Sequence, residues 1–216
     1  GTTLTIATTA SLTVNGSKVA VGAGCGGCLT AFLNYGTVEN VQIISDDKNA
    51  YCGLQMERAW PGPGLIKNVT ITGFQYGMRV TQCEYSMTFE NITLRNQKLC
   101  GLYANCNALA IRNLTSNNKI KVIQSEGGRI TLLDSKFTGG NGTAYAIYSN
   151  NGSIFTRNLT TTGYISALIN NGVPLAGANI TEYHSGPDYS QFANDGKSLG
   201  LAISETPVYT NNDLNT

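Results

Sequence analysis

The sequence predicts an all-β protein with the architecture of a right-handed parallel β-helix, a solenoid in which short strands stack rung upon rung. Three observations predict this fold. An Asn or Asp flanked by apolar residues recurs every 21 to 28 residues, the segments beside each copy alternate between apolar and polar residues, and no segment has helical periodicity. The copies are centred on Asn40, Asn68, Asn91, Asn113, Asp134, Asn158 and Asn179.

Each copy predicts a two-residue corner. In VENV at residues 38–41 and IKNV at residues 66–69, two residues separate two apolar ones, which interrupts the strand alternation and requires a bend. Asn suits the second corner position because it tolerates the left-handed backbone conformation and hydrogen-bonds nearby backbone. We therefore expect the corner amides of successive rungs to bond one another as an Asn-rich ladder.

Two strands are expected in each rung. One follows the corner, as in residues 69–73, with Val and Ile inward and Thr outward. The other precedes the corner, at residues 52–56, 76–80, 100–104, 146–148 and 167–169. With roughly 22 or 23 residues per rung, the chain predicts about nine rungs and, at ~4.8 Å per rung, a rod about 40 Å long. We expect one domain over residues 1–200 and an extended tail over residues 201–216.

Composition argues against several classes of function. Charged residues make up 12% of the chain and the net charge is +1, so we expect no basic surface that binds nucleic acid. No apolar run approaches the ~20 residues that span a membrane. The scattered acids predict neither a metal site nor a cofactor site. The chain starts at Gly1 without Met, which indicates a processed chain or a piece of a longer one.

All six cysteines lie in the first half of the chain. Cys28 precedes Cys52 by 24 residues and Cys83 precedes Cys106 by 23, about one rung in both cases. Equivalent positions on adjacent rungs fall within the Cα separation of a disulfide, so both pairs are candidate bridges, the alternative being a stack of buried thiols. The C-x-x-C pair formed by Cys25 and Cys28 has no second pair and no nearby His, so we expect no zinc site.

Eight N-x-S/T sequons predict a secreted or surface-exposed glycoprotein. Asn15, Asn141 and Asn151 each precede Gly, and we expect them in exposed turns where a glycan can attach. The other five coincide with predicted corners, where an amide held in the ladder is unavailable to a glycan. These five are Asn68, Asn91, Asn113, Asn158 and Asn179.

Four segments carry a resemblance to a known family: GLIKNVTI at residues 64–71, GFQYGMRV at 73–80, EYSMTFENITL at 84–94 and IRNLTS at 111–116. Through them residues 53–139 resemble the pectate-lyase superfamily, in particular an uncharacterised bacterial group related to polygalacturonases and to fungal exo-β-1,3-glucanases. The similarity continues to SLGL at 198–201 and ETP at 205–207. The resemblance implies the parallel β-helix fold and an association with polysaccharides.

The chain departs from the enzymes of that superfamily in two respects. Polygalacturonases share N-T-D, D-D, G-H-G and R-x-K motifs, but only Asp46-Asp47 is present here, and the one histidine, His184, is expected in a loop. The opening D-Y-G-A-x-G-D-G segment and the amphipathic helix that caps the first rung are also missing. A catalytic centre of the polygalacturonase type is therefore not expected.

A two-carboxylate glycosidase is still compatible with the sequence. Glu57 and Glu84 lie near equivalent points of consecutive rungs, beside Arg58 and Arg79, which we assign to substrate binding. Trp60, the only tryptophan, stands in an inserted loop and offers a face for stacking a sugar ring. In the structural alternative, both glutamates form exposed ion pairs with the arginines and Trp60 folds back over the rod.

Three functions therefore compete: a polysaccharide-acting enzyme, a glycan-binding module and a structural subunit. An enzyme of this kind would be a glycoside hydrolase or a polysaccharide lyase. The structural alternative follows from rod ends without a helical cap, since uncapped ends favour head-to-tail stacking of copies into an extracellular, glycosylated filament or coat. We expect first a secreted β-helix protein, extracellular or at the cell surface, associated with polysaccharide binding or degradation.

Overall fold

The computed structural model describes residues 37–45, 50–56, 63–81, 85–175 and 177–185. It also describes the backbone of residue 57 and of four strands between residues 2 and 31. All regular elements in this part of the chain are β-strands. Correspondingly, the described residues contain no helix long and apolar enough to cross a membrane.

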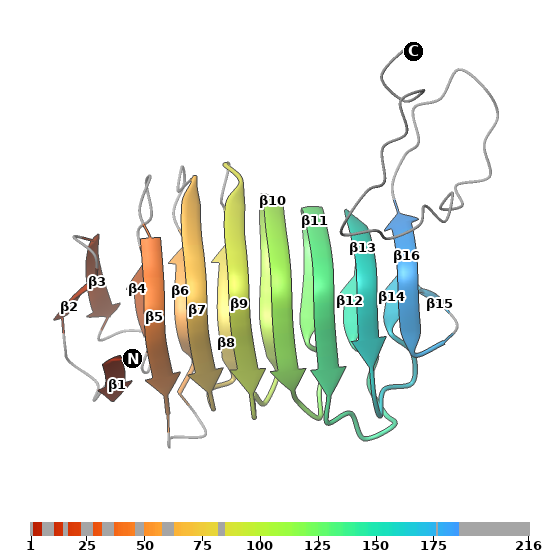
Figure 1. Ribbon diagram of the computed structural model, residues 1–216, viewed down its shortest axis with the longest axis horizontal. Helices are drawn as coiled ribbons and strands as arrows, with labels where there is room; N and C mark the ends of the chain where they lie inside the picture. Colours follow the sequence, from red (N-terminus) through yellow and green to blue (C-terminus); the bar gives the residue numbers. More distant parts are fainter. Residues whose placement is uncertain are drawn as a thin grey trace, which may run out of the picture.

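The strands wind into a rod with a front face and a back face, whose strands lie one behind the other in Figure 1. The front face holds β1 (Thr2–Thr5), β5 (Thr37–Ile44), β7 (Gly64–Thr72), β9 (Met87–Arg95), β13 (Gly152–Thr161) and β16 (Asn179–Ser185). The back face holds β4 (Cys28–Ala31), β6 (Cys52–Glu57), β8 (Tyr76–Thr81), β12 (Ile147–Ser149) and β14 (Leu168–Asn170). Two long strands, β10 (Cys100–Asn117) and β11 (Ile123–Thr138), belong to both faces.

The parallel register of each face aligns apolar side chains in rows that fill the rod. On the front face Ile43, Ile71 and Leu94 are level with one another and fully buried. The matching row of the back face is Leu54, Met78, Leu102, Ile123, Ile147 and Leu168, each at most 1% exposed. Burying a side chain of this size contributes about 1.5–3 kcal/mol, so these rows hold the rungs together. The predicted parallel β-helix is confirmed.

The predicted corner ladder is also confirmed. Asn40, Asn68, Asn91, Asn113, Asp134 and Asn158 all have left-handed φ angles, between 52° and 58°. The side-chain amides of the corner residues Asn68, Asn91 and Asn113 each donate to the Oδ1 of the corner Asn one rung earlier, at 2.9 Å in every case. The backbone conformation and the repeated amide bond together explain why the corner position takes Asn.

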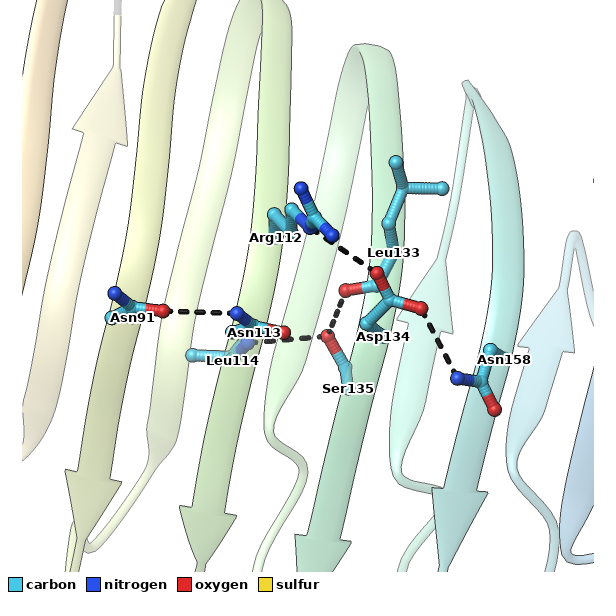
Figure 2. Close-up of polar contacts among 8 residues, drawn as sticks. All are labelled: Asn91, Arg112, Asn113, Leu114, Leu133, Asp134, Ser135 and Asn158. Carbon is cyan, nitrogen blue, oxygen red and sulfur yellow. Dashed lines mark hydrogen bonds and ion pairs between the residues drawn. The ribbon is translucent and has the colours of Figure 1, made fainter. Parts of the chain in front are cut away.

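The ladder changes character at Asp134, as Figure 2 shows. A carboxylate has no N–H with which to donate to Asn113. Asp134 instead accepts from Arg112 Nε at 3.3 Å and from Asn158 Nδ2 at 3.1 Å. The next residue, Ser135, accepts from the backbone N–H of Leu114 at 3.2 Å, so side-chain hydrogen bonds still connect these two rungs.

Both ends of the described rod leave the parallel repeat. The antiparallel hairpin strands β2 (Ser11–Val14) and β3 (Ser17–Gly22) precede β4, while β15 (Val173–Leu175) and β16 run antiparallel to β14 and β13. Asn179 therefore opens an antiparallel strand and is not a seventh corner, which corrects the sequence prediction. The predicted nine rungs are likewise too many for the described part of the chain, where the parallel repeat gives way to antiparallel pairs at both ends of the rod. The predicted tail lies outside the described residues.

The cysteines whose side chains the structure describes, Cys52, Cys100 and Cys106, are buried, and no disulfide joins them. Strand β4 pairs Leu29 with Leu54, so the register makes Cys28 level with Gly53 and not with Cys52. A separation of one rung therefore does not make these two cysteines equivalent. The side chain of Cys28 and the residues Cys25 and Cys83 lie outside the described part, and both bridges stay predictions.

Candidate functional site

The predicted carboxylate pair is only partly placed by the structure. Glu57 is the last residue of β6, and its backbone is level with Thr81 of β8. The side chain of Glu57 and the residues Arg58, Trp60 and Glu84 lie outside the described part of the chain. Their assignment to catalysis and substrate binding stays a prediction.

Arg79 is placed by the structure, in a cluster of tyrosines on the outer side of the back face. Its guanidinium carbon lies 5.1, 5.4 and 5.2 Å from the ring centroids of Tyr51, Tyr76 and Tyr103. Nη1 donates to the hydroxyl of Tyr51, and Nε is buried without a hydrogen-bond acceptor. Arg79 is thus held within the protein by three cation–π contacts and one hydrogen bond, and its assignment to substrate binding stays a prediction.

The tyrosine cluster itself was not predicted. Tyr76 makes edge-to-face contacts with Tyr51 and Tyr103, at centroid separations of 5.5 and 6.1 Å. Burial, followed by the charge of Glu126, raises the pKa of Tyr103. The signal in the sequence was the recurrence of Tyr at positions 51, 76 and 103, about one rung apart, beside the strands of the back face.

A hollow in the described part lies along the edge at which back-face strands lead into front-face strands. This edge is the upper edge of the rod in Figure 1. We call the hollow the upper groove. It has a volume of about 910 Å³ and extends over five consecutive rungs. Seven of its ten lining residues have polar side chains, and the other three are one alanine and two glycines: Ser86, Asn107, Ala108, Gly128, Arg129, Asn151, Gly152, Ser153, Asn170 and Asn171.

Two glycines line this groove at a place where adjacent rungs approach closely. Gly128 of β11 and Gly152 of β13 are level with each other in the lining. Gly128 has a φ of +76°, and a Cβ there would lie 1.5 Å from the carbonyl oxygen of Cys106. The ladder of β10 and β11 shifts register at this place, between Asn105 and Ala108. Glycine at both positions therefore allows the backbones of adjacent rungs to approach closely beside the bulge that borders the groove.

The groove contains a buried polar atom without a protein partner. Asn170 lines the groove, and its Oδ1 is buried and accepts no hydrogen bond. Ser149 is level with Asn170 in the register of β12 and β14, and its buried hydroxyl also has no hydrogen-bond partner. An unsatisfied buried oxygen is costly, so such atoms mark places where a water or a ligand group completes the hydrogen bonding.

Charge is sparse in the upper groove. Arg129 is the only ionisable group among its lining residues, and it is exposed. None of the described lining residues is a carboxylate, and the described chain holds no group of three or more His, Cys, Asp or Glu suited to a metal. The described surface of the groove is therefore suited to hydrogen-bonding a neutral polar ligand.

His184, predicted in a loop, lies in β16, level with Phe155 of β13. Among the predicted glycosylation sites, Asn68, Asn91, Asn113 and Asn158 use their amide N–H groups in the ladder. Asn141 and Asn151 are exposed, and Asn141 Oδ1 accepts from the hydroxyl of Thr143 at 2.6 Å. Asn15 lies outside the described residues, and glycan attachment stays a prediction at every sequon.

The fold defines the chain as a parallel β-helix protein with an extended polar groove along one edge. No protein-family model matches the sequence, and no curated protein matches it either. The argument on function therefore depends on the geometry and chemistry of the rod.

Proposed function

We propose that this protein binds a polysaccharide chain along the upper groove. The observation that carries the proposal is a continuous hollow over five rungs, lined almost entirely by amide, hydroxyl and backbone groups. At ~4.8 Å per rung the lining spans roughly 19 Å, a length that suits several sugar units of a linear chain. Sugars present many hydroxyls, which both donate and accept, and side-chain amides match both roles.

The chemistry of the lining supports this ligand class. Asn107, Ser153 and Asn171 supply neutral polar groups on different rungs, and Arg129 adds a cationic donor between them. The orphaned Oδ1 of Asn170 gains a hydrogen bond if a ligand hydroxyl or a bridging water reaches it. The sparse charge of the whole chain and its sequons are consistent with an extracellular or cell-surface location.

The resemblance to the pectate-lyase superfamily points to the same ligand class. Within this proposal, catalysis is a separate question that depends on Glu57 and Glu84. Ser86, two residues after Glu84, lines the groove, so a hydrolytic role for that glutamate can be tested on the same ligand. If the chain is an enzyme, we expect Glu57→Gln or Glu84→Gln to abolish turnover while binding persists.

The proposal is tested by screening immobilised neutral and acidic polysaccharides, followed by titration calorimetry with the best binder. We expect Arg129→Gln to weaken binding about tenfold, the worth of one charge-assisted hydrogen bond. Lys136→Gln is the matched control, because Lys136 carries the same charge, is exposed on β11 and does not line the groove. Equal losses in both variants, or no binder in the screen, would overturn the proposal.

A structural subunit is the second candidate. Within the described residues β15 and β16 each pair along one edge only, and Val173 in β15 is 70% exposed. An edge strand with one unpaired side and an exposed apolar residue favours contact with another copy. Negative-stain microscopy and light scattering test this candidate: filaments that shorten in Val173→Lys support it, and monomeric rods at high concentration contradict it.

A further inference from the structure

A second groove lies at the lower edge, where front-face strands lead into back-face strands. We call it the lysine groove, and its volume is about 440 Å³. Three lysines, two tyrosines and two aliphatic residues dominate its lining: Lys98, Lys119, Lys121, Tyr145, Tyr148, Leu99 and Ile120. An adjoining hollow of about 750 Å³ shares Lys98 and Lys119 and continues towards the ends of β5 and β7.

The stacking of rungs brings these residues together. Lys98 lies between β9 and β10, Lys119 and Lys121 lie between β10 and β11, and Tyr145 precedes β12. Backbone hydrogen bonds fix the three connections side by side, from Gly101 N–H to Lys121 O and from Val122 N–H to Ala146 O. Residues from one connection therefore lie about one rung, or ~5 Å, from those of the next.

The groove concentrates positive charge. No carboxylate occurs among its described lining residues. Most described acids are engaged elsewhere: Glu90 with Lys67, Asp134 with Arg112 and Glu182 with Arg157. Lys119 is exposed, and the Lys121 ammonium lies over the ring of Tyr148, 5.6 Å from its centroid. Lys121 is thus oriented beside an aromatic ring by a cation–π contact.

We propose that the lysine groove binds a sugar that carries a tetrahedral oxyanion ester, a sulfate or a phosphate. Lysine binds phosphate as a compact point charge, and a tetrahedral ester presents three free oxygens, so that ammonium groups from different rungs can each contact one of them, whereas a carboxylate presents only two. Tyr145, Tyr148 and the 47% exposed Leu99 offer apolar surface for the ring of the sugar. The volume falls within the range of small-ligand sites.

This inference does not depend on the proposed function. The upper groove takes a neutral chain along the opposite edge of the rod, and Arg129 belongs to that groove alone. Variants at the lower edge therefore leave the upper groove intact. Failure at one groove is distinguishable from failure at the other, because each has its own variant and its own class of probe.

The test uses four probes with one sugar backbone: dextran sulfate, dextran phosphate, carboxymethyl dextran and unmodified dextran of equal length. Binding to the whole protein is measured by titration calorimetry at several salt concentrations. We expect binding of the sulfate or phosphate derivative that is at least about tenfold tighter than that of carboxymethyl dextran. The ester that binds more tightly identifies the oxyanion. Equal binding of the carboxymethyl derivative, or no binding of either ester, would overturn the proposal.

Variants locate the site. Lys121→Gln and Lys119→Gln are each expected to weaken ester binding about five- to tenfold, as the loss of a charged hydrogen bond does. Tyr148→Leu should weaken binding further than Lys121→Gln, because it removes a ring that both faces the sugar and lies beneath the Lys121 ammonium. Lys136→Gln removes the same charge from the front face and should change affinity less than about twofold. A loss of affinity in Lys136→Gln equal to that in Lys121→Gln would show unspecific charge attraction and refute the site.

Discussion

At the scale of single residues, a corner Asn stabilises the fold in two ways, through its side-chain hydrogen bonds and through its tolerance of the left-handed backbone conformation. Asn91 donates to Asn68, accepts from Asn113 and has a φ of 55°. Asn91→Gly keeps the backbone conformation and loses two hydrogen bonds, so we expect a loss of about 1–3 kcal/mol in the free energy of unfolding. Asn91→Ala should lose about 1–2 kcal/mol more, because the Cβ of Ala makes the left-handed backbone conformation unfavourable.

Urea denaturation of the two variants and the wild type measures both contributions. Equal losses in the Gly and Ala variants would contradict the conformational part of the argument. A Gly variant as stable as the wild type would contradict the ladder as a source of stability.

The Cys100 thiol and the Tyr164 hydroxyl predict how the free energy of unfolding changes at alkaline pH. Complete burial raises the pKa of the Cys100 thiol from 9.0 to about 12, and burial also raises the pKa of Tyr164, whose hydroxyl donates to Asn118 O at 2.7 Å. Above pH 9 the thiol ionises in the unfolded chain but stays protonated in the folded one. The contribution of Cys100 to the free energy of unfolding is therefore fully present below pH 9 and is lost as the pH rises towards 12. The fully buried Cys100 thiol contributes a slope of about 1.4 kcal/mol per pH unit once its unfolded form is ionised, and the partly exposed Tyr164 hydroxyl contributes a smaller slope of the same sign.

Urea denaturation between pH 8 and pH 11 tests this dependence. Cys100→Ala should flatten the decrease that begins near pH 9, and Tyr164→Phe should flatten the part above pH 10. Parallel curves for the wild type and both variants would show that other groups govern the alkaline response.

At the scale of elements, the junction of β10 and β11 depends on one glycine. A Cβ at Gly128 would collide with the carbonyl oxygen of Cys106 at 1.5 Å, in addition to the strain of φ +76°. We expect Gly128→Ala to lower the free energy of unfolding by about 3 kcal/mol or more. Gly142→Ala is the matched control, since Gly142 has a φ of +77° and nothing lies within 4 Å of its Cβ position.

Thermal denaturation followed by circular dichroism compares the two glycine variants. Strain without a clash should cost the Gly142 variant only about 1–2 kcal/mol. Similar melting temperatures for the two variants would refute the steric argument at Gly128.

The same junction shows where sequence reasoning succeeds and where it stops. The strands and corners were predictable because Asn91, Asn113 and their equivalents recur with local apolar neighbours, and both signals are read within a few residues. The motif around Asn179 has the same local pattern, yet Asn179 begins an antiparallel strand. Pairing direction depends on what precedes the strand along the rod, and a local motif contains no information on it.

The candidate site was less predictable for a related reason. Asn170 and Arg129 belong to different rungs and come together only through the register of stacked strands. A one-residue shift changes which side chains are level, as the offset of Cys28 from Cys52 shows. Spacing therefore predicted the rungs, whereas the grooves required the register.

At the scale of the whole molecule, the rod is a one-dimensional stack in which each rung contacts only its neighbours. Strands β9, β10 and β11 have parallel partners on both sides in the front face, whereas β15 and β16 each pair along one edge within the described residues. Local opening should therefore be rarest in the middle. We expect amide hydrogen exchange to be slowest in residues 87–117 and fastest, among the described strands, in β15.

Hydrogen exchange in the Gly128→Ala variant tests how far along the rod a local defect accelerates exchange. If coupling passes mainly between nearest neighbours, exchange should accelerate in β10, β11 and β13, which contact the altered rung, and change much less in β5 and β7. Acceleration of equal size in β5 would mean that the rod opens as a single cooperative unit. A local response would show that a ligand in either groove can stabilise the rungs it contacts without stabilising the whole rod. Slower amide exchange on ligand binding would then identify the rungs that form each groove.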